Sequence, residues 1–107
     1  MTKQRFEELS KMNIFDQKWL EDVYLNFKPK TNGKIKTEIY DIEDLDDEIE
    51  NGILLETAYC DTQKDLENIF DFFEGNVYCW RDSKTDEIIS KGFIDGTLLE
   101  ESMLEDE

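Results

Sequence analysis

Residues 53–75 read ILLETAYCDTQKDLENIFDFFEG, and this stretch decides the fold class because a strand pattern is followed directly by a helix pattern. Residues 53–60 are rich in apolar side chains and predict a strand, which we expect in the centre of a sheet. Thr62 and Asp65 fit the Asp variant of a helix capping box. The apolar residues that follow recur at helical spacing as far as Gly75: Leu66, Ile69, Phe70 and Phe73.

Two further helices are predicted ahead of this stretch. Thr2 can cap a helix that runs to about Met12, and Asp16 can begin a second one. Leu25 falls outside the apolar stripe of the second helix, so we expect it to be exposed or to meet the first helix. The stripe itself is continuous and ends before Pro29: Trp19, Leu20, Val23, Tyr24 and Phe27.

Three other segments have the pattern of strands. Residues 35–39 alternate apolar and polar side chains after a turn in which Asn32 and Gly33 suit positive φ. Residues 76–81 and 87–94 predict a hairpin, and residues 97–103 could form a last strand or a short helix.

We therefore predict an α+β fold in a single small domain. Its two N-terminal helices and one further helix would pack on a mainly antiparallel sheet of three to five strands. The domain would span residues 1–103, and residues 104–107 would form a flexible acidic tail.

The charge of the chain is strongly negative and unevenly distributed. There are 28 acids and 12 bases, for a net charge of −16. Residues 1–36 hold eight bases and five acids, for +3, whereas residues 37–107 hold four bases and 23 acids, for −19. Such a charge disfavours direct contact with nucleic acid or an anionic membrane and speeds encounter with basic surfaces. We expect the partner to be a basic protein surface.

The residue types argue against an enzyme. The chain has no histidine, which removes the usual general base and the commonest zinc ligand. Its glycines are scattered singly, so no phosphate-binding loop is present. The acidic run fails the calcium-loop pattern, because a loop that starts at Asp46 would have Gly52 one place late and Thr57 in the twelfth position. We predict no cofactor and no dedicated metal site.

The same reasoning addresses location and the cysteines. The start of the chain carries charges where a signal peptide needs an apolar run, which favours a soluble cytoplasmic protein. Cys60 and Cys79 stand in apolar contexts, so in that compartment we expect buried free thiols.

The densest charge lies between Thr37 and Gln63, which enclose ten carboxylates and no base. Ile42, Leu45 and Ile49 keep helical spacing within this run and predict a short acidic helix over residues 43–50. Six carboxylates over about 12 Å approach the charge density of duplex DNA, about one per 1.7 Å. Repulsion within such a helix costs ~1–3 kcal/mol, which suggests a role outside folding.

A second acidic stripe is predicted on the helix that follows Thr62. By helix geometry Phe72 lies about 110° from the middle of the apolar stripe, so we expect it to be only partly buried. The candidate partner-binding residues are this aromatic and the two acidic groups: Asp41, Glu43, Asp44, Asp46, Asp47, Glu48, Glu50, Glu67, Asp71, Glu74 and Phe72.

In size and charge the chain is similar to the loose class of small acidic phage and plasmid anti-defence proteins, the anti-CRISPR and antirestriction DNA mimics. This resemblance implies an inhibitor that presents nucleic-acid-like charge to a nucleic-acid-binding enzyme. Two alternatives stay open. One is an immunity protein that neutralises a basic toxin, with Tyr40, Tyr59 and Phe72 as aromatic anchors. The other is an acidic regulatory or structural interaction module. Neither the target nor the oligomeric state follows from the sequence.

Overall fold

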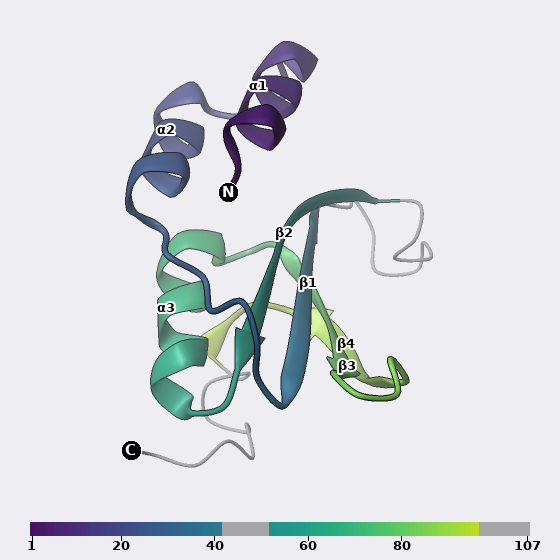
Figure 1. Ribbon diagram of the computed structural model, residues 1–107. Helices are drawn as coiled ribbons and strands as arrows, with labels where there is room; N and C mark the ends of the chain where they lie inside the picture. Colours follow the sequence, from purple (N-terminus) through teal and green to yellow (C-terminus); the bar gives the residue numbers. More distant parts are fainter. Residues whose placement is uncertain (42–51, 97–107) are drawn as a thin grey trace.

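The computed structural model describes residues 1–41 and 52–96 (Figure 1). The predicted acidic helix at 43–50, the segment 97–103 and the predicted tail 104–107 lie outside these described residues. The helices and strands follow one another in the order α1 (Lys3–Met12), α2 (Gln17–Asn26), β1 (Ile35–Asp41), β2 (Ile53–Cys60), α3 (Gln63–Phe73), β3 (Val77–Asp82) and β4 (Ile88–Phe93).

The strands form one antiparallel sheet in the order β2-β1-β3-β4. β1 pairs with β2 on one side, where Ile35 is opposite Cys60, and with β3 on the other, where Ile35 is opposite Asp82. Because β1 lies between them, β2 and β3 run parallel, and α3 carries the chain across one face of the sheet from one to the other. The predicted α+β fold with two N-terminal helices and a third helix is confirmed.

The expected central position of residues 53–60 is wrong. Among the described strands, β2 pairs with β1 alone and therefore lies at the edge of the sheet. The crossover through α3 takes the chain past β1 before β3 begins, so β1 and β3 occupy the centre. An apolar strand pattern predicts burial of side chains, and α1, α2 and α3 supply that burial for β2 without a second neighbouring strand.

Local signals set the helix ends as the sequence predicts. The Thr2 hydroxyl accepts a hydrogen bond from the Arg5 amide, and the Asp16 carboxylate accepts one from the Lys18 amide. Asn13 ends α1 in the left-handed conformation, with φ at 56°. Gly75, with φ at 90°, follows the end of α3. These caps satisfy backbone groups that a helix leaves unpaired at its ends.

The expectation of positive φ at Asn32 and Gly33 is wrong. Among the described residues, the positive values belong to Asn13, Gly75 and Asp86. Gly33 serves a close approach instead, because a Cβ there would lie 3.1 Å from the Cβ of Tyr59. The turn therefore needs a residue without a side chain so that it can lie against β2.

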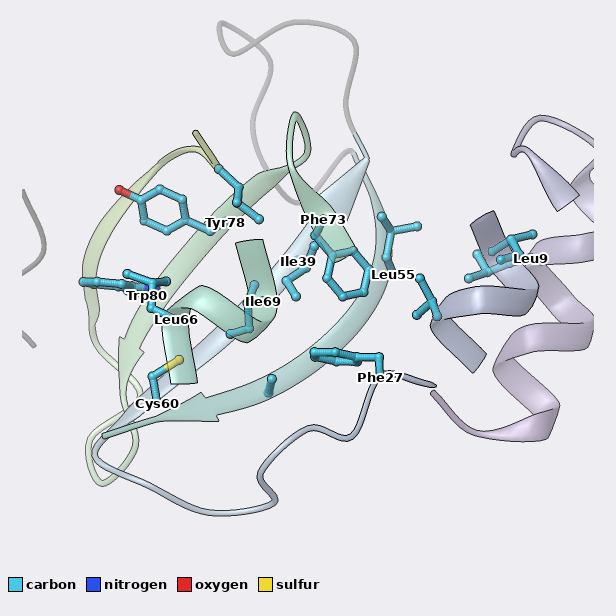
Figure 2. Close-up of a cluster of buried hydrophobic side chains, with 14 residues drawn as sticks. Leu9, Phe27, Ile39, Leu55, Cys60, Leu66, Ile69, Phe73, Tyr78 and Trp80 are labelled. Carbon is cyan, nitrogen blue, oxygen red and sulfur yellow. The ribbon is translucent and has the colours of Figure 1, made fainter. Parts of the chain in front are cut away.

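The core lies between one face of the sheet and the three helices (Figure 2). Leu20, Val23 and Phe27 from the predicted stripe of α2 are buried in it, whereas Leu25 is 64% exposed, as expected for a residue outside that stripe. The strands contribute side chains from alternate positions of one face. The sheet and α3 members of this cluster are Ile39, Leu55, Ala58, Cys60, Leu66, Ile69, Phe73, Tyr78 and Trp80.

The opposite face of the sheet has a second, smaller apolar cluster. Val77 and Cys79 are each only 1% exposed and pack with Tyr40. Cys60 is also buried, so the prediction of buried free thiols is confirmed. The two cysteines lie on opposite faces of the sheet, and β1 lies between the strands that carry them. These two strands are therefore about 10 Å apart, which is too far for a disulfide between Cys60 and Cys79. Burial raises the pKa of Cys60 to about 11, which keeps this thiol protonated and unreactive.

Candidate partner-binding surface

The outer face of α3 carries the second acidic stripe where the sequence predicts it. Glu67 and Asp71 on α3 and Glu74, the C-cap residue that follows it, are all exposed. No base among residues 1–41 and 52–96 forms an ion pair with any of them. Glu67 and Asp71 are a like-charge pair at i, i+4, and Asp71 and Glu74 lie at the helix end where the macrodipole disfavours anions. The stripe therefore opposes the stability of the helix that carries it.

At the other end of α3, where the helix begins, the acids do form ion pairs. The ammonium group of Lys30 lies 3.0 Å from a carboxylate oxygen of Asp65 and 3.4 Å from one of Asp61. Asp61 also accepts a hydrogen bond of 2.8 Å from the Lys34 amide. Local sequence patterns do not predict these ion pairs, because the base and the acids are more than 30 residues apart in the chain.

Asp65 is the most heavily used carboxylate of this end. It completes the predicted capping box with Thr62 and also accepts a hydrogen bond of 2.9 Å from the Asp61 amide. Burial by itself would raise the pKa of Asp65, but the Asp61 amide, the Lys30 ammonium and the Thr62 amide outweigh that effect and lower it. The same carboxylate raises the pKa of Lys30. These acids stabilise the start of α3, and Lys30 offsets part of their charge.

Apolar contacts hold the acidic end of α3 in place. The ring of Phe73 makes edge contacts with Phe27 at 5.1 Å and with Trp19 at 5.8 Å between ring centroids. The indole N–H of Trp19 donates a hydrogen bond of 2.7 Å to the carbonyl of Phe72, one of the groups that a helix end leaves unpaired. Because aromatic packing fixes this end, the acids beside it are not needed to hold the helix.

Phe72 is half-buried, as its angle on the helix predicts. Its ring packs against Phe27 at a centroid distance of 5.3 Å, so part of the side chain belongs to the contact between α2 and α3. Its contact with a partner stays a prediction. Tyr40, one of the aromatic anchors of the immunity-protein hypothesis, likewise packs on the second apolar cluster.

The strand register brings the acidic end of α3 to the same end of the sheet as two other points of the chain. Val77, just after α3, stands between Tyr40 and Phe93 in the sheet. Segment 42–51 is attached at Asp41 and at residues 52–53, which lie side by side at this end of the sheet. Segment 97–107 is attached at Gly96, at the same end. Asp41 itself is half-buried there.

The segments attached at these points are the most acidic in the chain. Residues 42–51 and 97–107 together contain 11 carboxylates and no base. The remaining 17 acids belong to the described residues, which also hold all 12 bases, for a net charge of −5. Six predicted site residues lie outside the described residues: Glu43, Asp44, Asp46, Asp47, Glu48 and Glu50.

Three further acids, on β1, on α1 and in the turn after β3, form ion pairs with nearby bases. Glu38 accepts a hydrogen bond of 2.6 Å from the Arg81 guanidinium, and this contact raises the pKa of Arg81. Lys36 lies 3.6 Å from Asp86, and Arg5 lies 3.0 Å from Glu8. Other described acids form no ion pair, among them Glu7, Glu21 and Asp22 as well as Glu67, Asp71 and Glu74.

Other kinds of site find little support in the described residues. A pocket of about 40 Å³ lies between the segment before β1, the outer edge of β2 and the first turns of α3, with Lys28, Tyr59 and Asn68 in its wall. Pockets for small-molecule ligands usually measure about 300–1,000 Å³, so this one suits a few waters. In the same residues, no group of three or more acids and cysteines is arranged to hold a metal ion.

Comparisons with known protein families, curated proteins and solved structures found no match to this chain. Of the helices in the described parts of the chain, none is long and apolar enough to cross a membrane.

Proposed function

We propose that this protein is an acidic inhibitor that occupies the nucleic-acid-binding cleft of an enzyme and competes there with nucleic acid. The observation that carries the proposal is where the acidic parts of the chain lie relative to one another. The exposed stripe of α3 and the attachment points of two segments with 11 carboxylates and no base share one end of the sheet. A cleft lined with Lys and Arg would meet this end as it meets a phosphate backbone.

The distribution of ion pairs supports this proposal over an acidic module that is charged only for solubility. Net charge for solubility can be spread over any exposed position. Here Lys30 forms ion pairs with the acids at the start of α3, whereas the acids at the end of α3 form no ion pair in the described residues. Acids at one end of the helix have an ion-pair partner and acids at the other end have none in the described residues. This difference favours a surface that is available to a cationic partner.

The inhibitor proposal and the immunity-protein alternative differ in what displaces the partner. The protein is immobilised and exposed to host lysate, and the captured proteins are eluted with excess duplex DNA, with excess RNA, or with salt. The proposal predicts a captured nucleic-acid-binding enzyme that either nucleic acid or moderate salt releases, since screening weakens exposed charge contacts. A captured partner that excess nucleic acid leaves in place would contradict it.

A matched pair of variants keeps this test specific. The first variant changes Glu67, Asp71 and Glu74 to amides, and the control changes three exposed acids of α1 and α2 in the same way: Glu7, Glu21 and Asp22. Both remove three charges. The proposal predicts weaker capture for the first variant and unchanged capture for the control.

A further inference from the structure

The outer edge of β2 is contacted by side chains from other parts of the chain. β2 pairs with β1 along one side, and no other described strand pairs with it. An edge strand whose amides and carbonyls are free can pair with a strand of another molecule, which leads to aggregation. The contacts along this edge therefore decide whether β2 is open to such pairing.

Arg5, on α1, contacts the edge near the start of β2. Its guanidinium donates a hydrogen bond to the carbonyl of Leu54, although the two residues are 49 positions apart in the chain. A second nitrogen of the same guanidinium donates a hydrogen bond of 3.0 Å to the carboxylate of Glu8, one turn further along α1. This ion pair fixes the side chain over the strand. An incoming strand would have to displace a charged donor from the Leu54 carbonyl.

The next part of β2 has an irregular backbone. Ile39 and Tyr40 are adjacent on β1, whereas their partners Glu56 and Leu54 are separated by one residue, so β2 contains a bulge. The amide of Thr57 donates a hydrogen bond of 3.1 Å to the carboxylate of Glu56. Bulges and charged side chains at an edge are common means of preventing pairing between sheets.

The far end of β2 lies against the segment that precedes β1. Residues 27–30 line the same small pocket as Ala58 and Tyr59. Gly33 lies so close that a Cβ there would be 3.1 Å from the Cβ of Tyr59. The second half of the edge is therefore covered by the chain that leads into β1, and the first half is covered through Arg5.

We propose that Arg5 closes the β2 edge: α1 holds its guanidinium on the Leu54 carbonyl and so prevents strands of other molecules from pairing there. Loss of this contact opens the first half of β2, while segment 27–33 still covers the second half. Repulsion between copies of charge −16 also opposes association, and salt weakens that repulsion. The Arg5 contact therefore matters most at high ionic strength. This inference does not rest on the proposed inhibitor function.

Analytical ultracentrifugation of the full chain and of Arg5→Ala, over a range of concentrations at ~0.5 M NaCl, tests the proposal. We expect the variant to associate about tenfold more tightly than the wild type or more, although it carries one more negative net charge. Hydrogen exchange of the associated variant locates the contact. Amides of residues 53–57 should exchange more slowly than in the dilute sample, and those of β4 should be unchanged.

Two control variants separate the edge contact from charge and from stability. Lys3→Ala removes the same charge from an exposed position of α1, and Ile69→Val shortens a buried side chain of α3 without touching α1. Both should associate as the wild type does. If far-UV circular dichroism shows that Arg5→Ala is unfolded, Arg5→Met decides the test, because it keeps the aliphatic part of the side chain and removes the donor.

Three results would overturn the proposal. The first is a folded Arg5 variant whose mass equals that of the wild type at every concentration. The second is an equal gain of association in Lys3→Ala or Ile69→Val, since charge or stability would then be the cause. The third is protection from exchange at β4 without protection of residues 53–57.

Discussion

Different contacts stabilise the two ends of α3, and acids take part in these contacts at one end only. At the first end, Asp61 and Asp65 take up the charge of Lys30 and the amides around the helix start. At the second end, aromatic rings from α2 and α3 hold the helix, and Asp71 and Glu74 contribute nothing favourable to it. Acids that stabilise a fold and acids that are kept free can thus be told apart on a single helix.

The largest expected effect comes from the aromatic contact at the second end. Phe73→Ala should lower the free energy of unfolding by about 3–5 kcal/mol, because it empties a fully buried site between α2, α3 and the sheet. Phe72→Ala, the half-buried neighbour, should cost clearly less. Urea unfolding of the two variants checks this difference. Equal losses would mean that the contact with Phe27 and Trp19 does not anchor this end.

A smaller loss is expected at the first end. Asp65→Ala should lower the free energy of unfolding by about 1–2 kcal/mol at pH 7, because it removes half of the capping box and the contact with Lys30. The folded pKa of Asp65 lies below its unfolded value, so its stabilisation is present above the unfolded pKa, about 3.9, and is lost as pH falls through the folded pKa. The gap between wild type and variant should therefore be constant from neutral pH to about pH 5 and shrink below about pH 4. A gap that does not change down to pH 2 would contradict this assignment.

The acidic stripe should respond with the opposite sign. Changing Glu67, Asp71 and Glu74 together to amides should raise the free energy of unfolding by about 0.5–1 kcal/mol at low salt, because like-charge repulsion and the unfavourable dipole contact are relieved. The gain should fall as salt is added. Urea unfolding at two salt concentrations measures it. A loss of stability in the triple variant would mean that these carboxylates have structural partners.

Much of the fold follows from local patterns in the sequence. Thr2, Asp16 and Thr62 begin their helices as their side chains predict, and the stripe of α2 gives the buried residues correctly. The position of β2 could not be predicted, because strand order depends on how α3 crosses the sheet and not on the strand's own residues. The ion pairs of Lys30 depend in the same way on contacts between distant parts of the chain.

The candidate site also has features that local spacing predicts and features that depend on contacts between distant parts of the chain. Helical spacing alone predicts that Glu67, Asp71 and Glu74 are exposed and that Phe72 is half-buried, and the exposure of all four side chains is as predicted, although Glu74 lies just after the last helical residue. Spacing cannot say which acids have a base beside them, so Asp61 and Asp65 look as available in the sequence as Asp71. The common end of the sheet shared by the stripe and the two acidic segments follows only from the register of β1, β3 and β4.

The most direct test of the account compares two quadruple variants against the captured partner in a salt titration. One changes Asp46, Asp47, Glu48 and Glu50 to amides, and the other changes four exposed acids elsewhere: Glu7, Glu21, Asp22 and Glu87. We predict that the first loses affinity by about tenfold or more, ~1.4 kcal/mol, and becomes less sensitive to salt, whereas the second keeps the affinity and salt slope of the wild type. Equal affinity and equal slope in the two variants would show that binding does not depend on where the acids lie, and the proposed function would be wrong.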